Sequence, residues 1–209
     1  GDTDSDGDGV SDAVEGYGDS DDDGIPDYLD NIVESYLAPS CGEMVMQSSV
    51  GTKISIGDTA LATGNNGVCI SEEDVGSADA DYDYLGGLFD FAVSGAQAGA
   101  SYNIVLPLNI AVPENAVLRG FLDANIGWQA FVENATNAIS SATAANGTCS
   151  EAGSSSYTDG LTVGATCVQL LIEDGGPNDA DGVADGTVTD ISGIATLYFG
   201  PPSSDSTIT

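Results

Sequence analysis

The N-terminal part of the chain carries acidic side chains at the spacing of a calcium-binding loop. Counted from Asp4, carboxylates fall at positions one, three, five, nine and twelve, and Gly9 falls at position six, where such a loop turns sharply. Position seven can offer its backbone carbonyl. Because Ca²⁺ takes about six to eight hard oxygen ligands, this spacing predicts a calcium site. The predicted ligands are Asp4, Asp6, Asp8, Val10, Asp12 and Glu15.

The same pattern recurs 15 residues further along the chain, with Gly24 at the turn. A solvated acidic tail is the alternative explanation for so many aspartates. Two repeats in one register, each with a bulky residue after the glycine, favour calcium, and Mg²⁺ fits less well because it retains its waters. We therefore expect two or more Ca²⁺ ions. The second set of predicted ligands is Asp19, Asp21, Asp23, Ile25, Asp27 and Asp30.

This tandem pattern, Asp-x-Asp-x-Asp-Gly-x-x-Asp-x-x-Asp/Glu, resembles the thrombospondin type 3 repeats of bacterial secreted proteins. The resemblance implies loops that are bridged by calcium and flanked by little helix. Dockerins carry a similar loop but space their repeats more widely. The step of 15 residues is also too short for two EF-hands with full flanking helices.

The charge of the chain is strongly one-sided. Its 209 residues include 34 Asp and Glu, but Lys53 and Arg119 are the only basic side chains and there is no histidine. Such a chain repels nucleic acid and anionic membranes, so neither is expected as a partner. Bound divalent cations or a salty medium must offset the negative charge. No apolar run of about 18 residues is present, so no membrane insertion is expected.

The cysteines indicate an oxidising compartment. Four cysteines allow three pairings, and a zinc site is disfavoured because the chain has no Cys-x-x-Cys and no histidine. We expect two disulfides between sequence neighbours, Cys41–Cys69 and Cys149–Cys167. The chain shows no signal peptide and begins with Gly1, as expected for a processed chain. The predicted location is secreted, extracellular or at the cell surface.

The rest of the chain alternates apolar and polar residues with period two. About eight short strands, separated by clusters of Gly, Asn, Asp and Ser, predict a β-sandwich of jelly-roll or immunoglobulin-like type. The predicted strands are Lys53–Ile56, Leu88–Val93, Tyr102–Leu106, Ala116–Leu122, Trp128–Val132, Cys167–Ile172 and Ile194–Phe199. The expected units are a tandem calcium-loop module at 1–38, a connector at 39–50, the sandwich at 51–200 and a polar tail at 201–209.

Helix signals are weak throughout. Asn31–Leu37 is expected to form a short helix that Pro39 would stop. Ala135–Ala145 is rich in small residues and is expected to give at most a helical turn. No longer amphipathic helix is expected.

Several motifs of the body resemble the choice-of-anchor domains that follow thrombospondin type 3 repeats in proteobacterial surface proteins. They are Leu85–Phe91, Trp128–Val132, Cys167–Leu170 and Glu173–Gly182. The resemblance runs from about residue 54 to 190 and implies a surface location and a β-domain.

Two further acidic groups lie in the body. One surrounds Gly182 with oxygen ligands that could form another calcium site, Asp174, Asn178, Asp179, Asp181 and Asp185. An Asx- and Gly-rich hairpin turn is the equally weighted alternative, because the register differs from that of the N-terminal loops. The other group could complete a metal site from another loop, but a solvated loop is the preferred expectation. It contains Glu72, Glu73, Asp74, Asp79, Asp81 and Asp83.

Candidate contacts for sugars are few. Exposed aromatics could bind glycans, and the candidates are Trp128, Tyr82, Tyr84 and Tyr157; for Trp128 we prefer the alternative of a core residue. Asn134 and Asn146 stand in N-glycosylation triplets.

The sequence indicates a structural protein rather than an enzyme. Without histidine, no Ser-His-Asp or Cys-His arrangement can form. We expect a calcium-stabilised extracellular structural protein that contacts copies of itself in a head-to-tail surface fibre. A strand at Ile194–Phe199 or the connector Glu43–Val50 could insert into the next copy. The alternative is a monomeric, calcium-dependent, glycan-binding adhesin module.

Overall fold

The computed structural model describes residues 3–7, 10–20, 24–32, 34–64 and 67–198, and most of them lie in or between short strands. Within that part there are thirteen strands. Those before residue 100 are β1 (Leu37–Pro39), β2 (Val45–Ser48), β3 (Lys53–Ile56), β4 (Cys69–Ile70), β5 (Tyr82–Tyr84) and β6 (Leu88–Ser94). The later ones are β7 (Ser101–Pro107), β8 (Val117–Phe121), β9 (Trp128–Ala130), β10 (Ala138–Ala142), β11 (Thr158–Asp159), β12 (Cys167–Glu173) and β13 (Thr187–Leu197).

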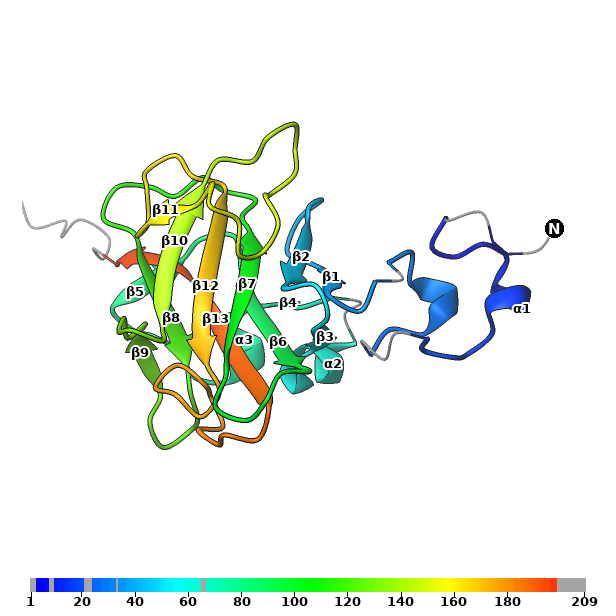
Figure 1. Ribbon diagram of the computed structural model, residues 1–209, viewed down its shortest axis with the longest axis horizontal. Helices are drawn as coiled ribbons and strands as arrows, with labels where there is room; N and C mark the ends of the chain where they lie inside the picture. Colours follow the sequence, from blue (N-terminus) through cyan, green and yellow to red (C-terminus); the bar gives the residue numbers. More distant parts are fainter. Residues whose placement is uncertain (1–2, 8–9, 21–23, 33, 65–66, 199–209) are drawn as a thin grey trace, which may run out of the picture.

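These strands form two antiparallel sheets that pack together as a β-sandwich (Figure 1). The first sheet has the order β1-β2-β7-β12-β10-β11. The second has the order β3-β6-β13-β8-β9, with β4 paired to β6 and β5 paired to β13. The mainly β class and the sandwich predicted from the alternation are therefore confirmed.

The core lies between the sheets because alternate residues of each strand face inward. In β3 the two isoleucines are buried and Lys53 and Ser55 are partly exposed. The largest fully buried side chains include Tyr102, Phe91 and Met46.

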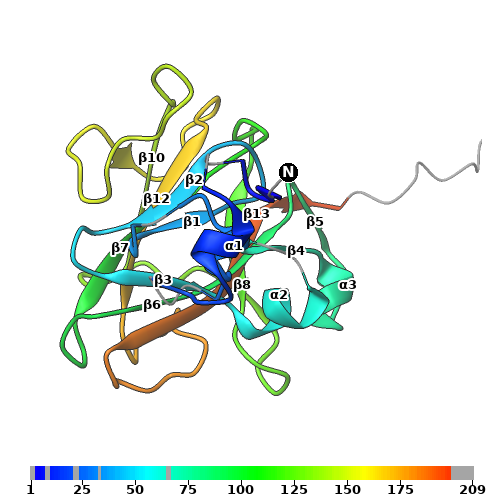
Figure 2. The same cartoon turned by 90° about the vertical axis from the view of Figure 1, so that its right-hand side faces the viewer.

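The calcium-loop module projects from one end of the sandwich (Figure 1). It contains two single helical turns, α1 (Asp12–Glu15) and η1 (Asp27–Leu29). Figure 2 looks at the molecule from this end, with α1 in front of the sheets. Two more short helices, α2 (Asp58–Thr63) and α3 (Glu72–Val75), belong to the body.

Both predicted disulfides are confirmed. Cys41–Cys69 joins the segment after β1 to β4, and so links the two sheets covalently. Cys149–Cys167 ties the loop after β10 to the first residue of β12.

The predicted helix at Asn31–Leu37 is wrong, because the described part of this segment enters β1. Backbone groups that a helix would use internally are bonded to the sheets instead. Ser48 donates its N–H to the carbonyl of Tyr36 at 2.9 Å, and Ile54 donates to Ser35 at 2.7 Å. β1 and β2 thus belong to the first sheet, although most of their residues fall in the predicted connector at 39–50.

The helical turn expected at Ala135–Ala145 is also wrong, since this segment contains β10. Along β10, Ile139 and Ser141 are buried and the residues between and beside them are partly exposed. Every residue of β10 pairs with β12. Conversely, two helices that are present, α2 and α3, were not predicted, because helices of six and four residues are too short to show an amphipathic period. The tail at 201–209 lies outside the described residues.

In the part of the chain that the structure describes, no helix combines the length and the apolar character needed to cross a bilayer.

Candidate calcium module

The two acidic loops fold alike, with the same hydrogen bonds 15 residues apart. Ser5 donates its backbone N–H and its hydroxyl to the two carboxylate oxygens of Asp12, both at 2.8 Å. Ser20 makes the same pair of bonds to Asp27, at 2.7 and 2.9 Å. The sequence repeat is therefore also a repeat in three dimensions.

Backbone contacts repeat at the same offset. The N–H of Asp12 bonds to the carbonyl of Thr3 at 2.9 Å, and that of Asp27 bonds to Gly18 at 2.8 Å. Each loop then enters a helical turn at its ninth position, α1 in the first and η1 in the second. Each unit is a closed loop whose ends are held together by main-chain bonds.

The first predicted ligand of each loop also accepts a bond from the loop's own backbone. Asp4 accepts from the N–H of Gly7 at 2.8 Å, and Asp19 accepts from Gly24 at 3.1 Å. A carboxylate oxygen that accepts one N–H retains a lone pair for a cation, so these bonds orient the ligand without consuming it.

Two carboxylate oxygens of the first loop are shielded from solvent, Oδ2 of Asp6 and Oε2 of Glu15. They belong to positions three and twelve of the ligand register. The hard oxygen donors of both loops fit Ca²⁺ by their chemistry.

The structure describes part of the predicted ligand set. Asp8, Asp21 and Asp23 lie outside the described residues, whereas the other nine predicted positions lie within them. Over residues 3–7, 10–20, 24–32, 34–64 and 67–198, no three carboxylates or cysteines are already gathered as a metal site. The loops are thus defined by their closure and register.

Sequence reasoning missed one role. Asp12 and Asp27 were predicted as ligands, and the structure in addition makes them the acceptors that close their loops. The available signal was a serine at position two of both loops, Ser5 and Ser20.

The acidic segment around Gly182 is held by backbone donors. Asp174 accepts N–H bonds from Gly99 at 2.7 Å, Gly186 at 2.8 Å and Asp185 at 3.2 Å. Burial opposes the ionisation of Asp174, but these bonds outweigh it and lower the pKa of its carboxyl. The carboxylate thus fastens the loop between β12 and β13 to the loop between β6 and β7.

The other candidates in this segment also have backbone partners. Asp179 accepts from the N–H groups of Gly175 at 2.8 Å and Thr189 at 3.0 Å. Asn178 bonds through its amide to both the N–H and the carbonyl of Val132, at 2.8 and 2.9 Å. The exposed Asp181 accepts from Val183. These side chains serve different backbone partners, which favours the hairpin turn over a further calcium site.

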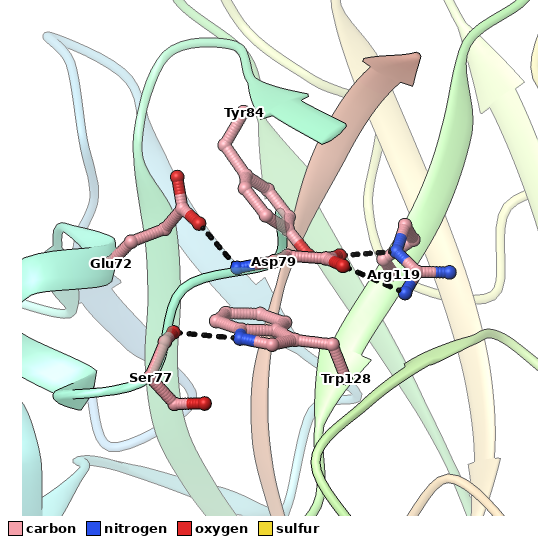
Figure 3. A network of polar contacts seen from close by, with 6 residues as sticks. All are labelled: Glu72, Ser77, Asp79, Tyr84, Arg119 and Trp128. Carbon is pink, nitrogen blue, oxygen red and sulfur yellow. Dashed lines mark hydrogen bonds and ion pairs between the residues drawn. The ribbon is translucent and has the colours of Figure 1, made fainter. Parts of the chain in front are cut away.

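The third acidic group contains a buried ion pair, shown in Figure 3. Arg119 bonds to both oxygens of Asp79, with Nη2 to Oδ1 at 3.1 Å, and both side chains are largely buried. Tyr84 donates its hydroxyl to Asp79 at 3.0 Å, and Glu72 accepts the backbone N–H of Asp79 at 2.9 Å. The expectation of a wholly solvated loop is therefore wrong for Asp79, because its carboxylate forms a largely buried ion pair with Arg119.

The aromatic candidates belong to the same network. The indole N–H of Trp128 donates to the carbonyl of Ser77 at 2.8 Å, and its ring lies 4.9 Å from that of Tyr84 (Figure 3). The guanidinium of Arg119 lies 4.0 Å from the ring centre of Tyr82. The alternative of Trp128 as a packed structural residue is thus favoured.

Tyr157 is buried elsewhere, and its hydroxyl donates to the carbonyl of Ser150 at 2.6 Å. Burial raises the pKa of Tyr157 to about 12. Asn134 and Asn146 are both exposed. Asn134 accepts bonds from the N–H and hydroxyl of Thr136 at 2.8 and 3.0 Å, so its amide caps a turn.

No known family model, curated protein or solved structure matches this chain. The resemblances to thrombospondin type 3 repeats and to choice-of-anchor domains accordingly remain predictions that rest on the motifs.

Proposed function

We propose that this chain is a calcium-stabilised extracellular structural protein. The observation that carries the proposal is the recurrence of the same closed loop, Ser5 to Asp12 and Ser20 to Asp27, in the register of calcium ligands. The formal net charge of −32 makes a divalent cation the natural counterion for these loops. The two disulfides favour an oxidising, extracellular setting.

Calcium would supply positive charge where carboxylates otherwise repel one another. The predicted ligands of the first loop are Asp4, Asp6, Asp8, Val10, Asp12 and Glu15, and those of the second are Asp19, Asp21, Asp23, Ile25, Asp27 and Asp30. The chain's own serine bonds and backbone closures preorganise these groups, which lowers the conformational cost of binding.

We propose further that copies of the chain associate head to tail. The calcium-loop module and the final residues of β13 lie at opposite ends of the molecule (Figure 1), an arrangement that suits end-to-end contact. The strands suggested as exchangeable are used within the chain: β13 pairs with β5, β6 and β8, and β2 pairs with β1 and β7. Contact through the projecting module therefore fits better than strand exchange.

The glycan-binding alternative has less support. The polar groups of Trp128, Tyr84 and Tyr157 are engaged within the chain. A cavity of about 790 Å³ lies near the Cys41–Cys69 disulfide, with Met44 and Asn109 in its wall, but its lining contains no aromatic side chain. We therefore do not propose this function.

Calorimetric titration of the metal-free protein tests the proposal. Ca²⁺ should bind at two or more sites, with Mg²⁺ binding much more weakly, and the melting temperature should fall in excess chelator. Electron microscopy of the calcium-loaded protein tests the fibre separately. An absence of calcium binding would refute the calcium role, whereas monodisperse particles at high concentration would refute only the fibre.

A further inference from the structure

The two calcium loops differ in how they meet the sandwich. Ile25, at position seven of the second loop, is 2% exposed and belongs to the main hydrophobic core together with Ile56 and Ala60. Val10, at the same position of the first loop, is 39% exposed. The second loop is therefore anchored to the body through Ile25, while the first loop lies farther out in the projecting segment (Figure 1).

The backbone of the second loop lies directly on α2. A Cβ atom placed on Gly24, at the turn, would lie 3.3 Å from Cδ2 of Leu61 in α2 and 3.9 Å from Cβ of Ile56 in β3. A Cβ atom placed on Gly7 or Gly16 of the first repeat would have no other atom within 4 Å. The turn that shapes the second calcium loop is thus supported by the body, and the described glycines of the first repeat face open space.

A buried carboxylate attaches α2 to the second sheet. Oδ2 of Asp90, in β6, accepts the N–H of Ala60 at 2.7 Å, and the carbonyl of Asp90 accepts the N–H of Gly57 at 2.9 Å. A Cβ on Gly57 would lie 1.8 Å from Oδ1 of Asp90, so the backbone at Gly57 packs against Asp90 with no room for a side chain. The second loop, α2 and β6 therefore form one continuous contact path.

The last predicted ligand of the second loop continues this path. Asp30 is 8% exposed and accepts the N–H of Ile32 at 2.9 Å, just before the chain enters β1. The neighbouring Leu29 packs against the main core. Ile25, before the helical turn η1, and Leu29, at its end, consequently both pack in or against the main core.

We propose that the two loops have different roles: calcium in the second loop stabilises the sandwich, whereas calcium in the first loop orders only the projecting end. This inference rests on the proposed calcium binding. Its physical basis is linkage, because a ligand stabilises those parts of the fold whose native conformation the binding site requires. The second loop requires Ile25 to be docked in the core. The described part of the first loop meets the second loop instead, because α1 contacts η1 and the ring of Tyr17 lies 5.4 Å from that of Tyr28.

A matched pair of ligand variants tests this division. Asp4→Asn and Asp19→Asn each remove one charge from position one of a loop, and the asparagine oxygen still accepts the local N–H bond. Trp128, the only tryptophan, lies in β9, so its fluorescence reports the melting of the sandwich. Each variant should lose one site in calorimetry. Asp4→Asn should retain the calcium-dependent rise in melting temperature, and Asp19→Asn should lose most of it.

A second pair leaves the ligands intact. Position seven offers its backbone carbonyl, so Ile25→Ala and Val10→Ala remove no ligand atom. Ile25→Ala should bind as many Ca²⁺ ions as the wild type but show a much smaller calcium-dependent rise in the Trp128 melting temperature. Val10→Ala should keep the full rise.

The outcomes separate this inference from the proposed function. If wild-type protein binds no Ca²⁺ in calorimetry, both are wrong. If it binds Ca²⁺ but Asp4→Asn and Asp19→Asn reduce the rise in melting temperature equally, or Ile25→Ala preserves it, only the division of roles is overturned.

Discussion

Asp190 lies opposite Phe91 in the register between β13 and β6, so its carboxyl group points to the same face of the sheet as a core phenylalanine. Phe91 is 1% exposed and Asp190 is 6% exposed. Burial, with smaller contributions from the nearby Asp90 and Asp179, raises the pKa of Asp190 to about 7 against the lowering effect of the Ser192 hydroxyl that donates to it. The core of this acidic protein thus contains a carboxyl group that holds its proton near neutrality.

The first prediction concerns the pH dependence of stability. Because folding raises the pKa of Asp190, its protonated form stabilises the fold below the unfolded pKa, and this contribution is lost as the pH rises toward about 7. The loss amounts to roughly 4 kcal/mol across that range. Urea unfolding from pH 4 to 8 should show this decline in the wild type and a much weaker one in Asp190→Asn.

Asp159→Asn provides the control, because Asp159 is exposed on β11. It should follow the wild-type curve. A parallel pH dependence of Asp190→Asn and the wild type would contradict the assignment.

The second prediction concerns the buried ion pair. Asp79→Ala leaves the Arg119 guanidinium without its carboxylate, and the cost of an uncompensated buried charge is about 3 kcal/mol or more. Adding Arg119→Met should recover part of this loss, because the double variant buries no charge. Denaturant unfolding of both single variants and the double variant measures the coupling; strict additivity would show that the pair contributes nothing.

The third prediction concerns the closure of the calcium loops. Ser20→Ala removes the hydroxyl that bonds Oδ2 of Asp27 at 2.9 Å, and Ser5→Ala removes its counterpart at Asp12. A hydrogen bond to a charged group is worth about 1.5 kcal/mol or more, so each variant should weaken its own site about tenfold. Calorimetry resolves the two sites, and unchanged affinities would mean that the serines do not preorganise them.

The fourth prediction concerns the disulfides. Cys149→Ser with Cys167→Ser opens a link between residues 18 apart, and Cys41→Ser with Cys69→Ser opens one of 28. Each loss should cost about 3 kcal/mol through the entropy of the unfolded chain. The unfolding midpoint in guanidinium measures it, and a midpoint unchanged in either double variant would argue against a stabilising role.

Local patterns predicted a large part of the fold. The alternation in Lys53–Ile56 and the apolar run at Tyr102–Leu106 indicated β3 and β7, because a side-chain period of two is a property of the strand itself. The pairing of the nearer cysteines was favoured by their separation, although four cysteines allow three pairings. β1 and β10 escaped prediction, since their strand character depends on pairing with other segments: β1 with β2, the next strand, and β10 with β12, further along the chain.

The candidate site divides in the same way. The register of Asp, Gly and Glu predicted two calcium loops from the sequence, because the ligand spacing of a twelve-residue loop is local; calcium binding itself stays a prediction. No local pattern distinguished the acids that bond to the backbone or to arginine. Asp79, Asp90 and Asp174 bond to partners that folding brings close, and Asp190 owes its raised pKa to burial.

The sequence by itself therefore determined the repeated loop register, the β class and the strongly acidic composition, all of which follow from residue type and short-range spacing. The tertiary structure alone decided that Ile25 is buried while Val10 is exposed, although both occupy the same position in equivalent loops. The physical reason is that burial depends on what lies opposite a side chain. Gly24 of the second loop lies against α2 and β3, and Ile25 beside it leaves water, whereas Val10 keeps 39% of its surface exposed.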